Sequence, residues 1–213
     1  MIKAIVVEDQ EIFRKGIISI LEDIKNVEVI GQADNGINFL KLLEKYKPDV
    51  VFMDIMMPLM DGIEATRKGI EKQPSIKIIA LSMQSEEEYL EQMLEAGAMG
   101  FLLKNVTEMD VEKAINSVLA GKRFFSEELI DVLTKKFLKK PEITERRPDI
   151  FNKNELEIIN LICGGFNNFQ IGEKLFLSNR TIDGYRSKML DKIGAVNSVG
   201  LVVYAIKNRL VTI

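Results

Sequence analysis

The sequence predicts an α/β protein, a doubly wound sheet of five parallel strands, followed by a second, smaller all-α domain. Over residues 1–120, short apolar runs of strand length alternate with segments whose apolar residues recur at helical spacing. Beyond residue 150, four short helical patterns replace that alternation. Strands that alternate with helices are typical of a parallel sheet with both faces covered by helices.

The predicted strands are short and rich in Val, Ile and Ala, which favours buried parallel strands. They cover residues 2–7, 27–31, 48–54, 76–82 and 98–103. The helices cover residues 10–24, 36–47, 61–73, a segment that opens at 85–88, and 107–120. Right-handed crossovers place the C-terminal ends of all five strands at one edge of the sheet.

Composition excludes several classes of function. Cys163 is the only cysteine, which excludes an internal disulfide and a multi-cysteine zinc site. Histidine is absent, which excludes nucleophilic triads with a histidine base and the usual zinc ligand sets. No apolar run approaches the roughly 18 residues of a membrane span, and residues 1–4 lead directly into a strand-like run rather than a signal peptide. We therefore expect a cytoplasmic protein that does not bind membranes.

Charge divides the chain. Residues 1–120 hold 13 Lys and Arg against 21 Asp and Glu, a net charge of −8, whereas residues 121–151 carry +2 and residues 152–213 carry +3. An acidic first part and a mildly basic last part indicate two domains with different partners. The proline-punctuated stretch 141–148 is typical of a linker. We predict a first domain at 1–121, a linker at 122–149 with a helix near 127–139, and a second domain at 150–213.

Polar side chains stand at four of the predicted strand ends. Glu8 and Asp9 follow the first strand, Asp54 ends the third, Ser82 ends the fourth and Lys104 follows the fifth. Because parallel strands end at one edge, these side chains converge there. Crowded carboxylates require a counter-charge, and a hard cation such as Mg2+ suits such oxygen ligands.

This set of groups suits an aspartyl phosphate. Asp54 is the candidate nucleophile, a metal ion and Lys104 neutralise the phosphoryl oxygens, and the hydroxyl of Ser82 binds one of them. A structural ion pair between Lys104 and an acid is the competing interpretation. The agreement of four separate strand ends favours the phosphoryl site.

These residues, together with Met57-Pro58, Asp61-Gly62 and Gly100–Lys104, make residues 1–120 resemble the receiver domain of a two-component response regulator, which has a flavodoxin-like fold. The resemblance implies that Asp54 is the phosphoacceptor. It also implies that the Mg2+ ligands are Glu8, Asp9, Asp54 and the backbone carbonyl of Met56. The implied phosphoryl-binding groups are Ser82 and Lys104, and the implied switch pair is Ser82 and Phe101. Since the chain has no histidine, the phosphoryl donor must be a partner, either a sensor histidine kinase or a phosphotransfer protein, or a small acyl phosphate.

The second domain is predicted to hold helices over residues 153–163, 168–175, 179–193 and 197–209. Asn167 and Ser178 are good N-caps for the second and third of these. Gly172 suits a close approach of two helices, and the short join at 175–178 suits a helix-turn-helix. The third helix carries Arg, Lys and hydroxyl groups that fit a DNA major groove. On charge alone, an ordinary helical bundle with a solvated face is the better interpretation.

The motifs Asn154–Ile159, Gly165–Ile171 and Leu177–Ile182 resemble the LuxR-type helix-turn-helix. With the receiver, the whole chain resembles a NarL/FixJ-type response regulator. The resemblance implies a phosphorylation-controlled transcription regulator rather than an enzyme, with 179–193 as the helix that reads double-stranded DNA. It also implies that helix 197–209 mediates dimerisation on DNA, so we expect a homodimer in the active state. The expected DNA contacts, weighted toward phosphate, are Thr181, Arg186, Lys188 and Lys192.

Asp183 and Gly184 depart from the lysine- or asparagine-bearing pattern that is common in this family. The carboxylate of Asp183 repels phosphate. It either accepts from a cytosine amino group or bonds Arg186 or Lys188 within the helix, and the second is favoured.

Two other functions stay open. A regulator could switch by protein contact without phosphate, although the intact set of strand-end residues argues against it. An aspartyl-phosphate hydrolase would need a second acid beside the nucleophile. Asp54 is followed by Ile55 and Met56 instead.

Overall fold

The structure, a computed structural model, describes residues 1–83, 89–137 and 150–211. The chain forms two compact units, Met1–Ser126 and Glu127–Ile213, which we describe separately. The predicted helix opening at 85–88 and the proline-punctuated stretch 141–148 lie outside the described residues. Within the described part of the chain, no helix has both the length and the apolar character needed to cross a membrane.

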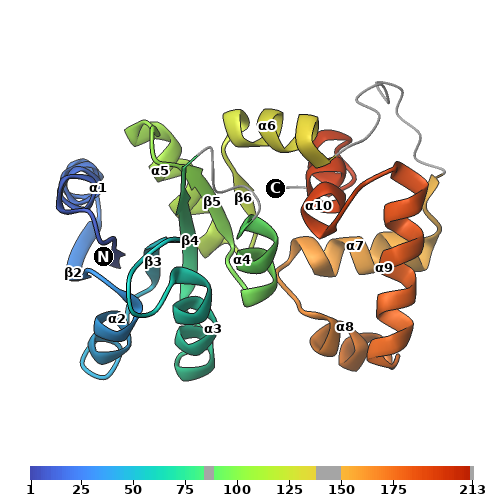
Figure 1. The fold of residues 1–213 in the computed structure, drawn as a ribbon, viewed down its shortest axis with the longest axis horizontal. Coiled ribbons are helices and arrows are strands. Elements are labelled where there is room, and N and C mark those ends of the chain that lie inside the picture. Colours follow the sequence, from blue (N-terminus) through green and yellow to red (C-terminus); the bar gives the residue numbers. More distant parts are fainter. Residues whose placement is uncertain (84–88, 138–149, 212–213) are drawn as a thin grey trace. The chain divides into compact units, whose positions relative to one another are not determined.

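The first unit is built on a parallel sheet (Figure 1). Its strands are β1 (Ile2–Val7), β2 (Val27–Ala33), β3 (Val50–Asp54), β4 (Lys77–Ser82), β5 (Gly100–Leu103) and β6 (Phe124–Phe125). They lie in the order β2-β1-β3-β4-β5-β6, so the described residues hold six strands where the sequence predicts five. β6 adds two residues that pair with Gly100 and Phe101 of β5. A strand of two residues is too short to show a period of alternation.

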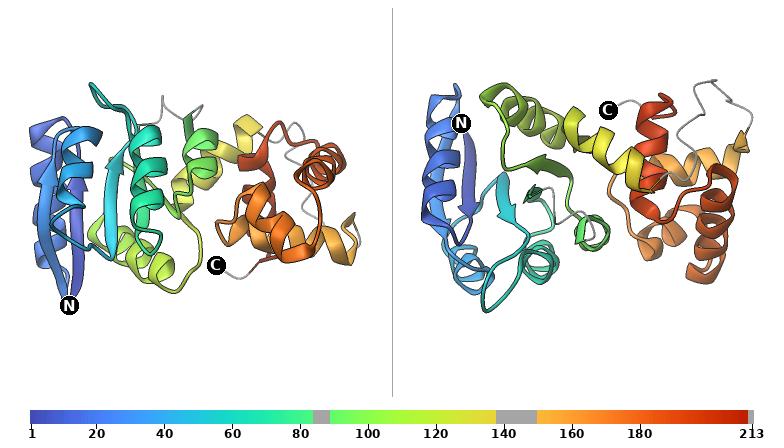
Figure 2. Two further views of the ribbon diagram at one scale, coloured as in Figure 1. Left: turned by 90° about the horizontal axis from the view of Figure 1, so that it is seen from below. Right: turned by 45° about the horizontal axis from the view of Figure 1, so that its top comes forward.

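Helices cover both faces of this sheet (Figures 1 and 2). They are α1 (Glu11–Asp23), α2 (Gly36–Leu42), α3 (Gly62–Lys72), α4 (Leu90–Ala96) and α5 (Glu108–Leu119). α1 and α5 contact each other on one face, and α3 contacts both α2 and α4 on the other. Ala4 and Val6 belong to the core under α1 and α5. Ile5 and Val7, equally buried, point to the opposite face because side chains alternate along a strand. The predicted doubly wound α/β fold is confirmed.

The second unit is all α-helical. It consists of α6 (Glu127–Phe137), α7 (Lys153–Cys163), α8 (Asn168–Leu175), α9 (Asn179–Ile193) and α10 (Ser198–Lys207). α7, α8 and α9 have the predicted bounds, and α10 is shorter than predicted at both ends. Asn167 caps α8 by accepting from the N–H of Gln170 at 2.9 Å, and Ser178 Oγ accepts from the N–H of Thr181 at 3.1 Å.

Gly172 lies where α8 meets the join to α9. A Cβ at this position would stand 2.6 Å from the carbonyl oxygen of Leu177. The expectation that Gly172 permits a close approach is therefore confirmed, and it is what allows the tight turn of the helix-turn-helix.

α10 forms the centre of the second unit. It packs against α6, α7 and α9, and eight of its ten residues are buried. Leu129 and Leu133 of α6 are completely buried. α6 is thus an integral part of this helical unit rather than a free connecting helix.

Candidate functional site

Three carboxylates meet at the C-terminal edge of the sheet. Glu8 and Asp9 directly follow β1, and Asp54 is the last residue of β3. β1 and β3 are parallel neighbours with Val7 opposite Met53, which brings the acids together. One carboxylate oxygen from each of the three lies within 4.8 Å of the others. Asp54 is 1% exposed and Glu8 is fully buried.

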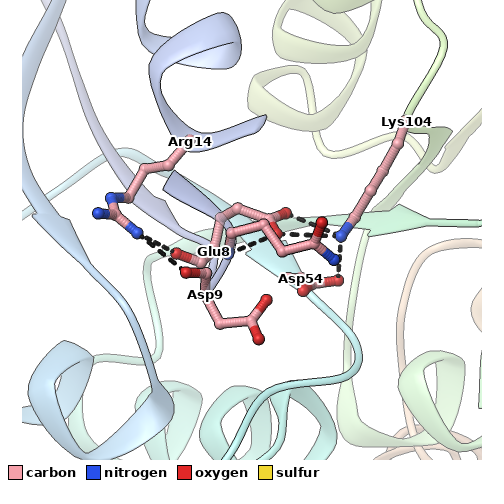
Figure 3. Close-up of polar contacts among 6 residues, drawn as sticks. Glu8, Asp9, Arg14, Asp54 and Lys104 are labelled. Carbon is pink, nitrogen blue, oxygen red and sulfur yellow. Dashed lines mark hydrogen bonds and ion pairs between the residues drawn. The ribbon is translucent and has the colours of Figure 1, made fainter. Parts of the chain in front are cut away.

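Lys104 reaches into this cluster from the end of β5 (Figure 3). Its Nζ lies 2.9 Å from Glu8 Oε2 and 3.0 Å from Asp54 Oδ1. Burial lowers the pKa of the Lys104 amine, but the hydrogen bonds that its ammonium donates to Glu8 and Asp54 outweigh burial and raise the pKa above its ordinary value. Lys104 therefore stays charged and balances part of the charge of the acids. The predicted convergence of the three acids and Lys104 at one edge of the sheet is confirmed.

The cluster has the properties of a site for a hard divalent cation. One ammonium faces three carboxylates, so negative charge remains in excess. Asp9 Oδ1 is buried and accepts no hydrogen bond from any described residue. An all-oxygen set of this kind is what Mg2+ prefers. Met56 follows Asp54 by two residues, in the connection from β3 to α3, and the role of its carbonyl stays a prediction.

Arg14 of α1 also belongs to the site, although no sequence motif indicates it. Its Nη1 donates to the backbone carbonyl of Glu8 at 2.7 Å and to that of Asp9 at 3.4 Å (Figure 3). Its Nε donates to Gln32 Oε1 of β2 at 3.2 Å. A cation in the first turn of a helix is unfavourable for the helix dipole, and that anomaly was the available signal.

Ser82 and Phe101 lie on the next two strands of the sheet, β4 beside β3 and β5 beside β4. Ser82 is buried at the end of β4, and its hydroxyl donates to the carbonyl of Met83 at 2.9 Å. Phe101 of β5 is fully buried and stacks on Phe125 of β6, with ring centroids 4.6 Å apart and planes 8° from parallel. Phe101 thus points inward in this conformation.

The residues expected to contact DNA divide into two groups. Thr181 and Lys188 are exposed on α9. Arg186 is half-buried, and its Nη1 donates to Ser198 Oγ at the start of α10 at 3.4 Å. Arg186 therefore links α9 to α10, and its contact with DNA stays a prediction.

Lys192 forms an ion pair within the unit. Its Nζ lies 2.6 and 2.7 Å from the two carboxylate oxygens of Glu155 on α7 and donates to the carbonyl of Ile150 at 3.1 Å. Glu155 is almost completely buried. Lys192 thus holds α9 on α7, and its contact with DNA phosphate stays a prediction. Sequence spacing could not show this contact, because 37 positions separate the two residues.

Asp183 differs from expectation as well. Its carboxylate accepts a hydrogen bond from the side-chain amide of Asn168 on α8, rather than bonding Arg186 or Lys188 within α9. The physical reason is tertiary: the packing of α8 on α9 offers a donor that helical spacing along α9 does not reveal.

Lys192→Gln is expected to lower the free energy of unfolding by about 2 kcal/mol near pH 7, because it leaves a buried carboxylate without its counter-charge. Burial raises the pKa of Glu155, but the hydrogen bond from Lys192, that from the backbone N–H of Asn152, the charge of Lys192 and, least, the charge of Lys188 outweigh it and lower the pKa. Because the pKa of Glu155 is lower in the folded state than its ordinary value of 4.5, the ionised carboxylate stabilises the fold at pH values above 4.5. This stabilisation is lost as the pH falls through the folded-state pKa. Urea unfolding of wild type and variant at pH 7 and at pH 3.5 measures both effects.

Lys188→Gln is the matched control, since it removes the same charge from the exposed side of the same helix. It is expected to change stability by less than about 0.5 kcal/mol. Equal loss in both variants, or a difference that does not shrink at low pH, would contradict the structural role of Lys192.

Comparison with known proteins adds two domain matches and full-length relatives. Residues 4–116 match the family described as response regulator receiver domain, and residues 149–205 match that described as bacterial regulatory proteins, luxR family. The chain is 35% identical over 211 residues to the response regulator GacA of Pseudomonas syringae pv. syringae, covering 99% of this chain and 98% of that protein. It is 31% identical over 226 residues to the transcriptional regulatory protein DegU of Brevibacillus brevis, covering 100% and 96%.

Solved structures are similar to this chain over nearly all of its length. The response regulator ChrA of a heme-sensing two-component system matches with a TM-score of 0.54 and 28% identity, covering 99% of this chain and 98% of that chain. The structure of an RcsB–DNA complex matches with a TM-score of 0.58 and 27% identity, covering 96% and 98%.

Proposed function

The chain belongs to the two-component response regulators of the NarL/FixJ type, and from this membership we propose that phosphorylation of Asp54 controls its dimerisation and its binding to DNA. It is a DNA-binding transcription regulator and not an enzyme. The observation that carries the proposal is the buried carboxylate of Asp54, held beside Glu8, Asp9 and Lys104 at one edge of the sheet. We also propose a cytoplasmic location. We propose residues 1–121 as the receiver and 150–213 as the DNA-binding domain, with 122–149 as a connecting segment whose helix α6 packs on the second unit.

Asp54 receives the phosphoryl group by attack of a carboxylate oxygen on phosphorus. A new P–O bond forms as the P–N bond of a phosphohistidine breaks, and its electron pair leaves with the imidazole of the donor. The chain has no histidine, so a sensor histidine kinase or phosphotransfer protein supplies that group. Lys104 places its ammonium beside Asp54 and offsets the charge that arrives. When bound, Mg2+ screens the charge of the phosphoryl oxygens, and its proposed ligands are Glu8, Asp9, Asp54 and the carbonyl of Met56.

Ser82 and Phe101 are the proposed switch. The hydroxyl of Ser82 must leave the carbonyl of Met83 in order to donate to a phosphoryl oxygen on Asp54. Any change near Phe101 acts on Phe125, because the two rings are stacked and the N–H of Ser126 donates to the carbonyl of Phe101 at 3.1 Å. Only Ser126 separates β6 from α6 in the chain. We therefore assign β6 the role of carrying the change from the switch into α6.

Dimerisation through α10 requires a rearrangement of the second unit. α6 packs on α10, and its Leu129 and Leu133 are buried. A second copy of the chain that pairs through α10 has to replace part of the contact between α6 and α10. Release of α6 is thus the step that couples the switch to a homodimer, since a ligand or modification can shift an equilibrium only by its different contacts in the two states.

Gel-shift titrations with and without a small acyl phosphate and Mg2+ test the proposal. We expect the phosphorylated protein to bind its operator more tightly and to sediment as a dimer. Identical DNA binding and identical mass in both conditions would favour the second candidate, a regulator switched by protein contact without phosphate.

Lys188→Gln is expected to weaken operator binding and to reduce the slope of log affinity against log salt by about 1, because one phosphate contact releases about one counterion. Fluorescence-anisotropy titrations at several salt concentrations measure both quantities. Lys153→Gln, which removes an exposed lysine from the start of α7, is the control and should leave the slope unchanged. An unchanged slope in Lys188→Gln would remove Lys188 from the interface.

A further inference from the structure

We propose that Arg14 is a positioning residue for Mg2+: its guanidinium fixes the backbone of Glu8 and Asp9 so that their carboxylates are in place before the ion binds. The inference deepens the proposed function and rests on it. The carrying observation is the bifurcated bond from Arg14 Nη1 to two consecutive carbonyls, those of the two acids that follow β1 (Figure 3).

The contacts of Arg14 join three elements. Its Cα lies on α1, its Nη1 bonds the end of β1 at 2.7 Å, and its Nε bonds Gln32 of β2 at 3.2 Å. A planar guanidinium with several fixed donors can hold such an arrangement, whereas an ammonium group acts as a single point charge. The backbone of the two acids is therefore held by a side chain that also contacts the neighbouring strand β2.

Arg14 adds to the few bonds that hold the connection between β1 and α1. That connection contains only Glu8, Asp9 and Gln10, and the side chain of Gln10 forms no capping bond to the described residues of α1. The backbone N–H of Gln10 donates instead to Glu8 Oε1 at 3.2 Å. The carboxylate that supports the turn is thus also a proposed metal ligand. Arg14 holds the turn independently of that carboxylate, so Glu8 can turn to the ion without loss of the loop.

Charge and position act in opposite directions on Mg2+ affinity. A cation beside the acids repels Mg2+, so a purely electrostatic role predicts that removal of the Arg14 charge tightens Mg2+ binding. A positioning role predicts that its removal weakens binding. Loss of residues that orient metal ligands typically costs 10- to 100-fold in metal affinity. The sign of the change therefore separates the two roles.

The test uses the full-length protein with three substitutions. Arg14→Gln removes both the planar set of guanidinium donors and the charge. Arg14→Lys keeps the charge but loses the planar set of donors. Lys15→Gln removes a charge from the adjacent position, where the lysine is exposed and pairs with Glu11 at 2.7 Å. Mg2+ affinity is measured by titration calorimetry and by the rise in melting temperature with Mg2+ concentration. The rate of labelling by acetyl phosphate is measured across the same concentrations.

We expect Arg14→Gln to weaken Mg2+ binding by about 10-fold or more. Arg14→Lys should weaken it at least as much, because it keeps the repelling charge without the paired donors, and Lys15→Gln should stay within about twofold of wild type. The labelling rate of Arg14→Gln should return to near the wild-type rate at saturating Mg2+. Equal or tighter Mg2+ binding by Arg14→Gln would overturn the inference. So would a labelling rate lowered by the same factor at every Mg2+ concentration, because that is the result of a merely structural role.

The experiment distinguishes failure of the inference about Arg14 from failure of the proposed function. If wild type and all variants bind Mg2+ alike and label alike, the inference about Arg14 is wrong and the proposed function stands. If wild type shows neither Mg2+ binding nor labelling, the proposed function is wrong and the inference falls with it.

Discussion

Asp54→Asn is expected to lose all labelling by acetyl phosphate in the presence of Mg2+, together with the phosphorylation-dependent gain in DNA binding. The amide has almost the shape of the carboxylate, so the buried site at the end of β3 can keep its packing. It carries no charge and is a poor nucleophile, so no P–O bond forms. A phosphate-affinity gel after incubation with acetyl phosphate and Mg2+ measures the labelling, and gel-shift titrations measure the DNA binding.

Asp49→Asn is the matched control, because it makes the same change just before the other end of β3. The carboxylate of Asp49 accepts from the backbone N–H of Lys3 at 2.8 Å on the exposed surface. Labelling of this variant should equal that of wild type. Persistent labelling of Asp54→Asn would place the phosphoacceptor elsewhere, and loss of labelling in both variants would trace the effect to the fold of the strand.

The convergence of the acids and Lys104 could be predicted from the sequence because a single rule governs it. Each parallel strand ends at the same edge, so a residue directly after a strand is placed by the strand alone. Asp54 needs no knowledge of side-chain direction to be assigned to that edge. The same reasoning holds for the caps of α8 and α9, where the contact spans only three residues.

The rest depends on contacts that no local rule gives. Arg14 reaches back to β1 and across to β2, and Lys192 pairs with Glu155 from another helix. Both are long, flexible cations whose spacing along their helices does not indicate where the charged group lies. β6 was missed for a different reason. Its two residues gain their strand conformation only from pairing with β5.

Gly62→Ala is expected to destabilise the receiver unit by about 3 kcal/mol or more and to lower labelling of Asp54. Gly62 opens α3, and its N–H donates to the carbonyl of Ile55 at 2.9 Å. A Cβ at Gly62 would stand 2.0 Å from the carbonyl oxygen of Asp54 and 3.1 Å from Cα of Ile55. Both are backbone atoms of the phosphoacceptor segment and cannot rotate away. Either α3 or the end of β3 must move, and the second movement displaces the Asp54 carboxylate.

Gly16→Ala gives the opposite expectation from the same substitution. Gly16 lies within α1 and is exposed, and no described atom comes within 4 Å of a Cβ built there. Ala is the better helix former, so this variant should gain about 0.5 to 1 kcal/mol. Urea unfolding measures both variants, and acetyl phosphate labelling at saturating Mg2+ compares their sites. A Gly62→Ala protein as stable as wild type would show that α3 can move without loss of free energy of unfolding. The close contact between α3 and β3 would then not be the reason why glycine follows Asp61.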